Sequence, residues 1–150
     1  MAAVFRFRFQ RILDLKCKQE QALEIELSRV NQSLARAEDA RREWECRREE
    51  AFLGLRKARL AGNLVENAQW TAYVRHVRGR IAQCRRQVAE LREGREHVRR
   101  ELERVMQSRK LLENYRDRLR ERFLAAQEKA EERLHETYSA HKFVRTEGIS

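Results

Sequence analysis

Proline is absent from this 150-residue chain, and glycine occurs only five times. Proline breaks helices because its ring clashes with the preceding turn and its nitrogen carries no hydrogen. Nothing in the sequence therefore forces a long helix to end. Aromatic residues make up 7% of the chain and charged residues 39%, which is typical of long helices with solvated outer faces rather than of a layered core.

Motifs that support catalysis are also missing. There is no glycine-rich phosphate loop, and no serine has a histidine at a motif spacing. A metal site made of Glu131, His135 and His141 is conceivable, because the first two lie one helical turn apart, but His141 falls out of phase with them. We therefore expect no enzymatic activity, no cofactor and no metal ion.

Cysteine is scarce, and long apolar runs are absent. Cys17, Cys46 and Cys84 are neither closely spaced nor even in number, so they do not predict a disulfide framework. The chain has no apolar run of 18 residues and no cleavable signal segment. These features predict a reduced, cytosolic protein in which Cys84 acts as a small apolar residue.

What the chain does contain is a heptad pattern in two stretches. Apolar residues recur at alternating steps of three and four residues, an average period of 3.5. This period keeps them on one side of an underwound helix. A partner helix is then required to cover the apolar side. The polar positions are Lys16, Glu20, Arg41 and Arg48 in the first stretch and Arg95, Arg109 and Arg116 in the second. The apolar positions are Phe9, Leu13, Leu23, Leu27, Val30, Leu34, Ala37, Trp44, Ala51, Leu55 and Ala58, then Trp70, Val74, Val77, Ile81, Cys84, Val88, Leu91, Val98, Leu102, Val105, Leu112, Leu119, Phe123, Ala126 and Ala130.

The pattern resets at residues 61–66, where the chemistry of a turn is present. Gly62 suits the left-handed residue that ends a helix. Asn63 followed three residues later by Glu66 is a typical start of the next helix. Gly54, Gly79 and Gly94 lack such neighbours, so we place them inside helices.

These observations predict an all-α protein, an antiparallel coiled-coil hairpin that forms one domain over residues 1–150. The first helix covers about 9–60, the turn 61–63 and the second helix about 64–140, followed by a frayed tail. With the turn centred on Gly62, Phe9 lies opposite Tyr115. The second helix then overhangs the first beyond about Arg118, with its apolar stripe uncovered.

The charge is strongly positive and unevenly placed. Lys and Arg number 34 against 24 Asp and Glu, a net charge of +10. Positive charge is concentrated near the N-terminus and from Arg104 to Arg122. A hairpin brings these two regions together at its open end, which predicts a basic surface that attracts acidic partners.

Several landmarks, in this order and at this spacing, resemble one known family. They are the opening run Phe5-Arg6-Phe7-Arg8-Phe9-Gln10-Arg11-Ile12-Leu13-Asp14-Leu15, the Gly62 turn, Trp70-x-x-Tyr73 followed by Val77 and Ile81, and the run from Ser108 to Arg118. Together they resemble the FliJ family, the small coiled-coil proteins of the flagellar type III export apparatus. The resemblance spans nearly the whole chain.

The resemblance implies a stalk that inserts into the hexameric export ATPase and reaches toward the cytoplasmic domain of the export gate. It also implies contacts with the ATPase regulator, a part in recycling export chaperones, and a peripheral position at the inner face of the cell membrane. A slender basic rod is compatible with these expectations, because weak charge contacts with an acidic pore lining allow repeated docking.

The resemblance and the charge pattern together give two expected contact surfaces. Tyr73 and His76 lie beside the heptad seam, where a tyrosine ring can bury area while its hydroxyl stays wet. The expected ATPase contact consists of Phe5, Arg6, Arg8, Arg11, Arg109, Lys110, Arg116, Arg118 and Arg122, and the expected export-gate contact of Trp70, Tyr73, His76 and Val77.

Two other functions are compatible with the same charge and pattern. One is a basic coiled coil that binds nucleic acid or an anionic membrane. Outside the run from Phe5 to Phe9, however, aromatic residues do not interleave with basic ones as a base-stacking surface requires. Against a membrane, the apolar face is a narrow seam rather than a broad one rich in exposed aromatic residues. The other is a homodimeric coiled-coil scaffold in which two chains form the seam. The sequence alone does not decide between a monomeric hairpin and such a dimer.

Overall fold

A computed structural model describes residues 3–148 and is helical over nearly all of them. Helix α1 runs from Gln10 to Ala61 and helix α2 from Leu64 to Glu147, and the described residues contain no strand. The two helices pack against each other, which confirms the predicted all-α hairpin. Helix α2 ends at Glu147 rather than near residue 140. Residues 1, 2, 149 and 150 of the expected domain lie outside the described residues.

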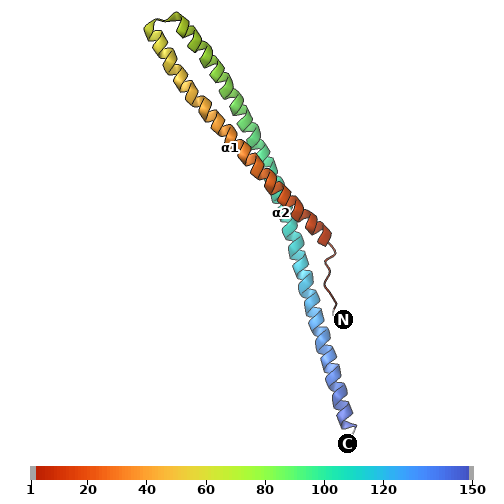
Figure 1. The fold of residues 1–150 in the computed structure, drawn as a ribbon. Coiled ribbons are helices and arrows are strands. Elements are labelled where there is room, and N and C mark those ends of the chain that lie inside the picture. The colour runs from red at the N-terminus through yellow and green to blue at the C-terminus, as the bar shows by residue number, and fades with distance from the viewer. Residues whose placement is uncertain (1–2, 149–150) are drawn as a thin grey trace. The chain divides into compact units, whose positions relative to one another are not determined.

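The chain divides into two compact units, which we describe separately. Unit 1 combines Met1–Gln19 with Val105–Ser150, and unit 2 is the continuous segment Glu20–Arg104. Each unit contains part of α1 and part of α2. In unit 2 the two helices run antiparallel and are joined by the turn (Figure 1).

The turn of unit 2 has the predicted chemistry. Gly62 adopts φ of 69°, the left-handed conformation that ends a helix. The amide of Asn63 donates to the carbonyl of Ala58 at 3.1 Å, and its side-chain Oδ1 accepts from the amide of Glu66 at 3.2 Å. Asn63 therefore closes α1 with its backbone and caps α2 with its side chain.

The core of unit 2 lies along the predicted seam. One cluster contains Leu34, Ala37 and Val88, with Leu91 packed against it. Closer to the turn, a second cluster joins α1 to α2 through residues that are all heptad positions, with Phe52 and Trp70 packed around it. Its buried members are Ala51, Leu55 and Val74. The 3.5-residue period therefore located the interface correctly.

A glycine makes room for the largest side chain of this core. A Cβ atom placed on Gly54 would lie 2.5 Å from two atoms of the Trp70 indole. By contrast, a Cβ on Gly79 or Gly94 would meet nothing within 4 Å. All three glycines lie inside helices as predicted, but only Gly54 has a packing reason to be glycine.

Ion pairs flank the seam of unit 2. Arg92 donates from Nη2 to Oε1 of Glu38 at 3.0 Å, and Arg85 lies 3.7 Å from Glu45. The hydrogen bond from Arg92 is the main reason why the pKa of Glu38 lies below its ordinary value. Both pairs lie at the surface, so each contributes little to the free energy of folding.

In unit 1 an extended segment lies along α2. Residues 3–7 are not helical, and the segment from Val4 to Phe9, which we call the strap, precedes α1. The ring centroid of Phe5 lies 5.7 Å from that of Phe123, and the rings of Phe7 and Phe9 lie 6.0 and 6.2 Å from Tyr115. The last distance confirms the predicted pairing of Phe9 with Tyr115.

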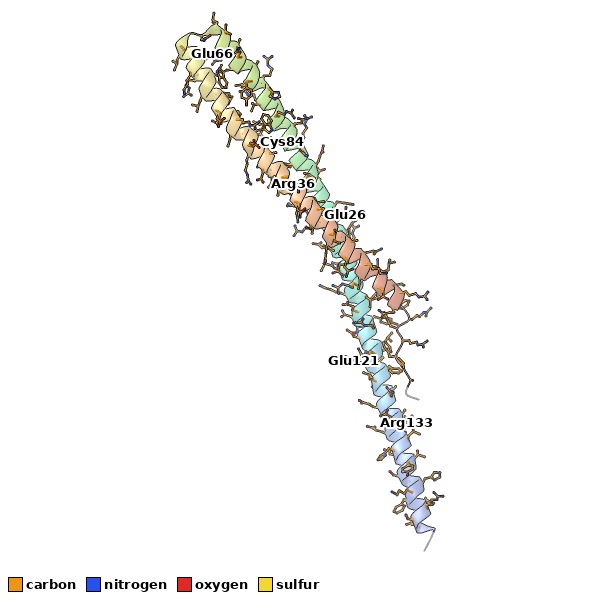
Figure 2. All side chains as sticks on the ribbon, viewed as in Figure 1. Glu26, Arg36, Glu66, Cys84, Glu121 and Arg133 are labelled. Carbon is orange, nitrogen blue, oxygen red and sulfur yellow. The ribbon has the colours of Figure 1, made fainter. Side chains whose placement is uncertain are left out.

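The strap changes where the uncovered part of α2 begins. We expected α2 to be uncovered beyond about Arg118, but residues of the strap lie beside α2 as far as Gln127. The reason is that Phe5 and Phe7, which precede α1, extend the contact with α2 beyond the first residue of α1. From residue 128 to residue 147 every residue of α2 is exposed, and no other described segment lies beside Arg133 in this stretch (Figure 2).

The polar seam positions are half-buried. The Nε atoms of Arg41 and Arg95 are buried and have no hydrogen-bond partner among residues 3–148. Arg109 lies in the seam of unit 1 and donates from Nη1 to both carboxylate oxygens of Glu113 at 3.0 Å.

No described helix is long and apolar enough to cross a membrane.

Candidate functional site

A groove of about 1010 Å³ in unit 1 is the clearest candidate site. One wall is the strap with the first turn of α1, and the other is α2. The apolar part of its lining includes Phe7, which is 9% exposed, and Leu124. The full lining is Ala3, Val4, Phe5, Arg6, Phe7, Arg8, Gln10, Arg11, Arg116, Arg120, Phe123, Leu124 and Gln127.

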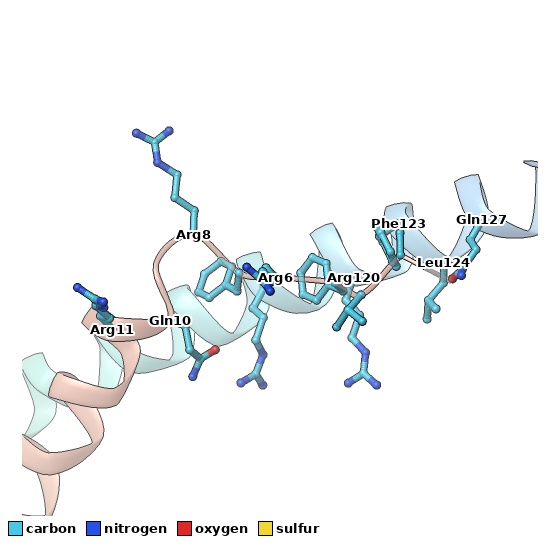
Figure 3. A pocket seen from close by; sticks show the side chains of 13 residues that line it. Arg6, Arg8, Gln10, Arg11, Arg120, Phe123, Leu124 and Gln127 are labelled. Carbon is cyan, nitrogen blue, oxygen red and sulfur yellow. The ribbon is translucent and has the colours of Figure 1, made fainter. Parts of the chain in front are cut away.

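The lining of the groove contains five arginines and no carboxylate. Arg6, Arg8 and Arg11 come from the strap and the start of α1, and Arg116 and Arg120 come from α2. In Figure 3 the guanidinium group of Arg8 extends to one side of the strap, and that of Arg120 extends to the other. The first turn of α1 also lacks an acidic residue. The groove is therefore suited to an acidic partner.

The local sequence explains how the strap displays these arginines. In extended chain, alternate side chains point to opposite sides, so Phe5 and Phe7 both face α2 and Arg6 between them faces away. Phe9 contacts Tyr115 from the turn at residues 8–9, where Arg8 is exposed. The guanidinium of Arg8 also lies 5.6 Å from the centroid of the Phe9 ring, a cation–π distance.

All nine residues predicted for the ATPase contact lie in unit 1. Arg6, Arg8, Arg11, Lys110, Arg118 and Arg122 are exposed. The other three are half-buried and have contacts inside the unit. Phe5 packs on Phe123, Arg109 pairs with Glu113, and the Nε of Arg116 lies 3.3 Å from Asp117.

Sequence reasoning missed part of this site. Arg120 lines the groove but was not among the predicted contact residues, and neither were Leu124 and Gln127. The signal for the strap was present in the alternation of Phe and Arg from residue 5 to residue 9, a period of two that indicates extended chain. That alternation does not say which surface the three rings will cover.

The four residues predicted for the export-gate contact lie in unit 2 and separate into two kinds. Val77 is fully buried and Trp70 packs against the core, so both belong mainly to the interior. Tyr73 and His76 are exposed. The Tyr73 ring lies 6.0 Å from Trp70, and the His76 ring lies 5.9 Å from Trp44.

Of the exposed pair, Tyr73 lines a second groove, of about 730 Å³, together with Trp70. Lys57, Glu50 and Glu66 supply charges of both signs there. This mixture of aromatic and charged groups is typical of protein contact surfaces.

Within the described part of the chain, no group of three His, Cys, Asp or Glu side chains is placed to hold a metal ion.

Fold and site together define a class, a two-helix coiled-coil protein that carries a basic groove between its N-terminal strap and its second helix. The family model for the flagellar FliJ protein matches residues 5–148, and the chain belongs to this family. It is therefore a component of the flagellar export apparatus. No curated protein and no solved structure matches the chain.

Proposed function

We propose that this protein is the non-enzymatic stalk of the flagellar export apparatus, which inserts into the hexameric export ATPase and connects it to the export gate. In this role it resides in the cytoplasm, peripherally at the inner face of the cell membrane. It also contacts the ATPase regulator and takes part in recycling export chaperones. Membership of the FliJ family supports the role.

The observation that carries the proposal is the charge of unit 1. Residues 3–19 and 105–127 contain eleven Lys and Arg against four Asp and Glu. Five of the arginines line one groove. Charges of one sign on two neighbouring segments attract an acidic surface without a fixed orientation, so contact can be broken and remade as ATPase subunits change state.

The exposed Tyr73 and His76 of unit 2 are the proposed contact with the gate. The ring of Trp70 supports Tyr73 and that of Trp44 supports His76, whereas Val77 is buried in the core. Replacing Tyr73 and His76 with alanine should therefore weaken gate binding without unfolding the hairpin.

Nucleic acid is a poorer partner for unit 1. Base stacking needs free aromatic faces beside basic groups. Here Phe7 is buried, and the rings of Phe5 and Phe9 pack on Phe123 and Tyr115. The run that looked most suited to stacking is therefore occupied within unit 1.

Charge reversal tests the ATPase contact. The variant combines Arg6→Glu, Arg118→Glu and Arg122→Glu, which are exposed and come from both segments of unit 1. We expect stimulation of ATP hydrolysis by the hexameric export ATPase to fall by about tenfold or more, because attraction becomes repulsion. Arg109 is left intact because its pairing with Glu113 belongs to the seam.

A matched control keeps the change in net charge equal. Arg29→Glu, Arg36→Glu and Arg86→Glu alter three exposed residues of unit 2. Stimulation should then fall by less than about twofold, with the helical circular-dichroism signal of both variants equal to that of the parent. Equal losses in the two variants would show that net charge, and not unit 1, governs the contact.

A further inference from the structure

We propose that the turn end of unit 2 binds directly to an anionic lipid surface. The segment concerned, which we call the tip, is residues 60–74. In a chain that is 39% charged, this stretch contains a single charged residue, Glu66, which is labelled at the turn in Figure 2. Such a gap in the charge pattern sets the tip apart from the rest of both helices.

The tip carries three aliphatic side chains that no helix covers. Leu60 is 83% exposed, Leu64 81% and Val65 68%. They flank Gly62, whose positive φ reverses the chain. None is a seam position, so packing of α1 on α2 does not explain them. Exposed aliphatic residues gathered at one place mark a contact surface.

Four exposed basic residues, which we call the collar, flank this apolar cap along the chain. Arg56, Lys57 and Arg59 precede it on α1, and Arg75 follows it on α2. An apolar cap flanked by cations suits the two layers of a bilayer surface, because aliphatic side chains enter the acyl boundary while the cations meet anionic headgroups.

The collar also distinguishes lipid from a second copy of this chain. Two tips placed against each other would bring Arg56, Lys57 and Arg59 close to their own counterparts, and like charges repel. An anionic bilayer has no such conflict. This contact is separate from the proposed ATPase contact, because it uses unit 2 alone. Trp70 and Tyr73 of the proposed gate contact belong to the tip, but the three aliphatic side chains proposed to meet lipid are not part of that contact.

The test is flotation of the full chain with vesicles of phosphatidylcholine, with and without phosphatidylglycerol. The tip variant is Leu60→Ser, Leu64→Ser and Val65→Ser. The control variant, Leu111→Ser, Leu134→Ser and Val144→Ser, changes three residues of unit 1 that are 71%, 71% and 66% exposed. Neither set alters net charge, so general attraction of the +10 chain is the same in all three proteins.

We expect the parent to bind anionic vesicles more tightly than neutral ones. The tip variant should lose about tenfold or more in partitioning, and the control variant less than about twofold. Equal binding by the tip variant and the parent would overturn the proposal, as would failure of the parent to bind at millimolar lipid. If light scattering shows that the parent is a dimer and the tip variant is a monomer, the cap binds a second copy of this chain and the proposal is overturned. Stimulation of the ATPase should be unchanged in the tip variant.

Discussion

At the scale of single residues, Gly54 shows how one absent atom determines a helix contact. The Trp70 indole occupies the space where a Cβ on Gly54 would lie. We expect Gly54→Ala to lower the free energy of unfolding by about 1–3 kcal/mol, because the ring must leave its place in the core. Urea unfolding followed by circular dichroism measures this change.

Gly79 supplies the matched control, since it also lies inside a helix but has open space around it. Gly79→Ala should raise the free energy of unfolding by up to about 1 kcal/mol, because alanine favours helix more than glycine does. A gain in stability from Gly54→Ala as well would mean that the indole does not pack against Gly54 in solution.

The polar residues of the seam have a different effect. Buried Nε atoms of Arg41 and Arg95 lack hydrogen-bond partners among the described residues, which lowers stability relative to an apolar pair. Polar groups at single seam positions specify the register of a coiled coil. These arginines therefore favour one alignment of α1 and α2 over others shifted by a heptad.

At the scale of elements, the strap is the least regular part of the described chain and depends on few contacts. Phe7 is its most buried residue and touches both Phe9 and Tyr115. We expect Phe7→Ala to release the strap, because truncating a buried phenylalanine removes about 3–5 kcal/mol of packing. Trypsin should then cut after Arg6 and Arg8 at least about tenfold faster, as followed by mass spectrometry.

Val4 provides the comparison for this prediction. It belongs to the same strap but is 79% exposed, so Val4→Ala should leave the cleavage rate within about twofold of the parent. If Phe7→Ala leaves the cleavage rate unchanged, the strap is not held by its aromatic contacts.

The helices, unlike the strap, could be predicted from the sequence. Heptad spacing predicted the seam, because the regular period of a helix decides which residues share one face. Gly62 and Asn63 predicted the turn, because glycine adopts the left-handed conformation that ends a helix and asparagine caps the next one. The groove was predicted only in part. The clustering of arginines followed from the hairpin, but Arg120 entered the site because Phe5 and Phe7 pair with α2, a contact without a local sequence rule.

At the scale of the whole molecule, the remaining alternative is a homodimer in which two chains form the seam. The packing of Leu34 and Ala37 on Val88 joins α1 and α2 of one chain. A chain with Glu38→Cys and Arg92→Cys, at the exposed pair that joins the helices at 3.0 Å, and with its own cysteines replaced by alanine, should therefore form a crosslink within one chain when treated with a short bis-maleimide. Its yield should not depend on protein concentration, because the two thiols belong to the same molecule.

Gel electrophoresis under denaturing conditions separates the two results. A crosslink within one chain migrates as a monomer with altered mobility, whereas a crosslink between chains gives a band of twice the mass that grows with concentration. The single substitutions Glu38→Cys and Arg92→Cys, made in the same background, are the controls, since each has only one thiol. A dominant band of twice the mass in the double variant would mean that α1 pairs with α2 of another chain, and the same charge pattern would then belong to a scaffold rather than to a stalk.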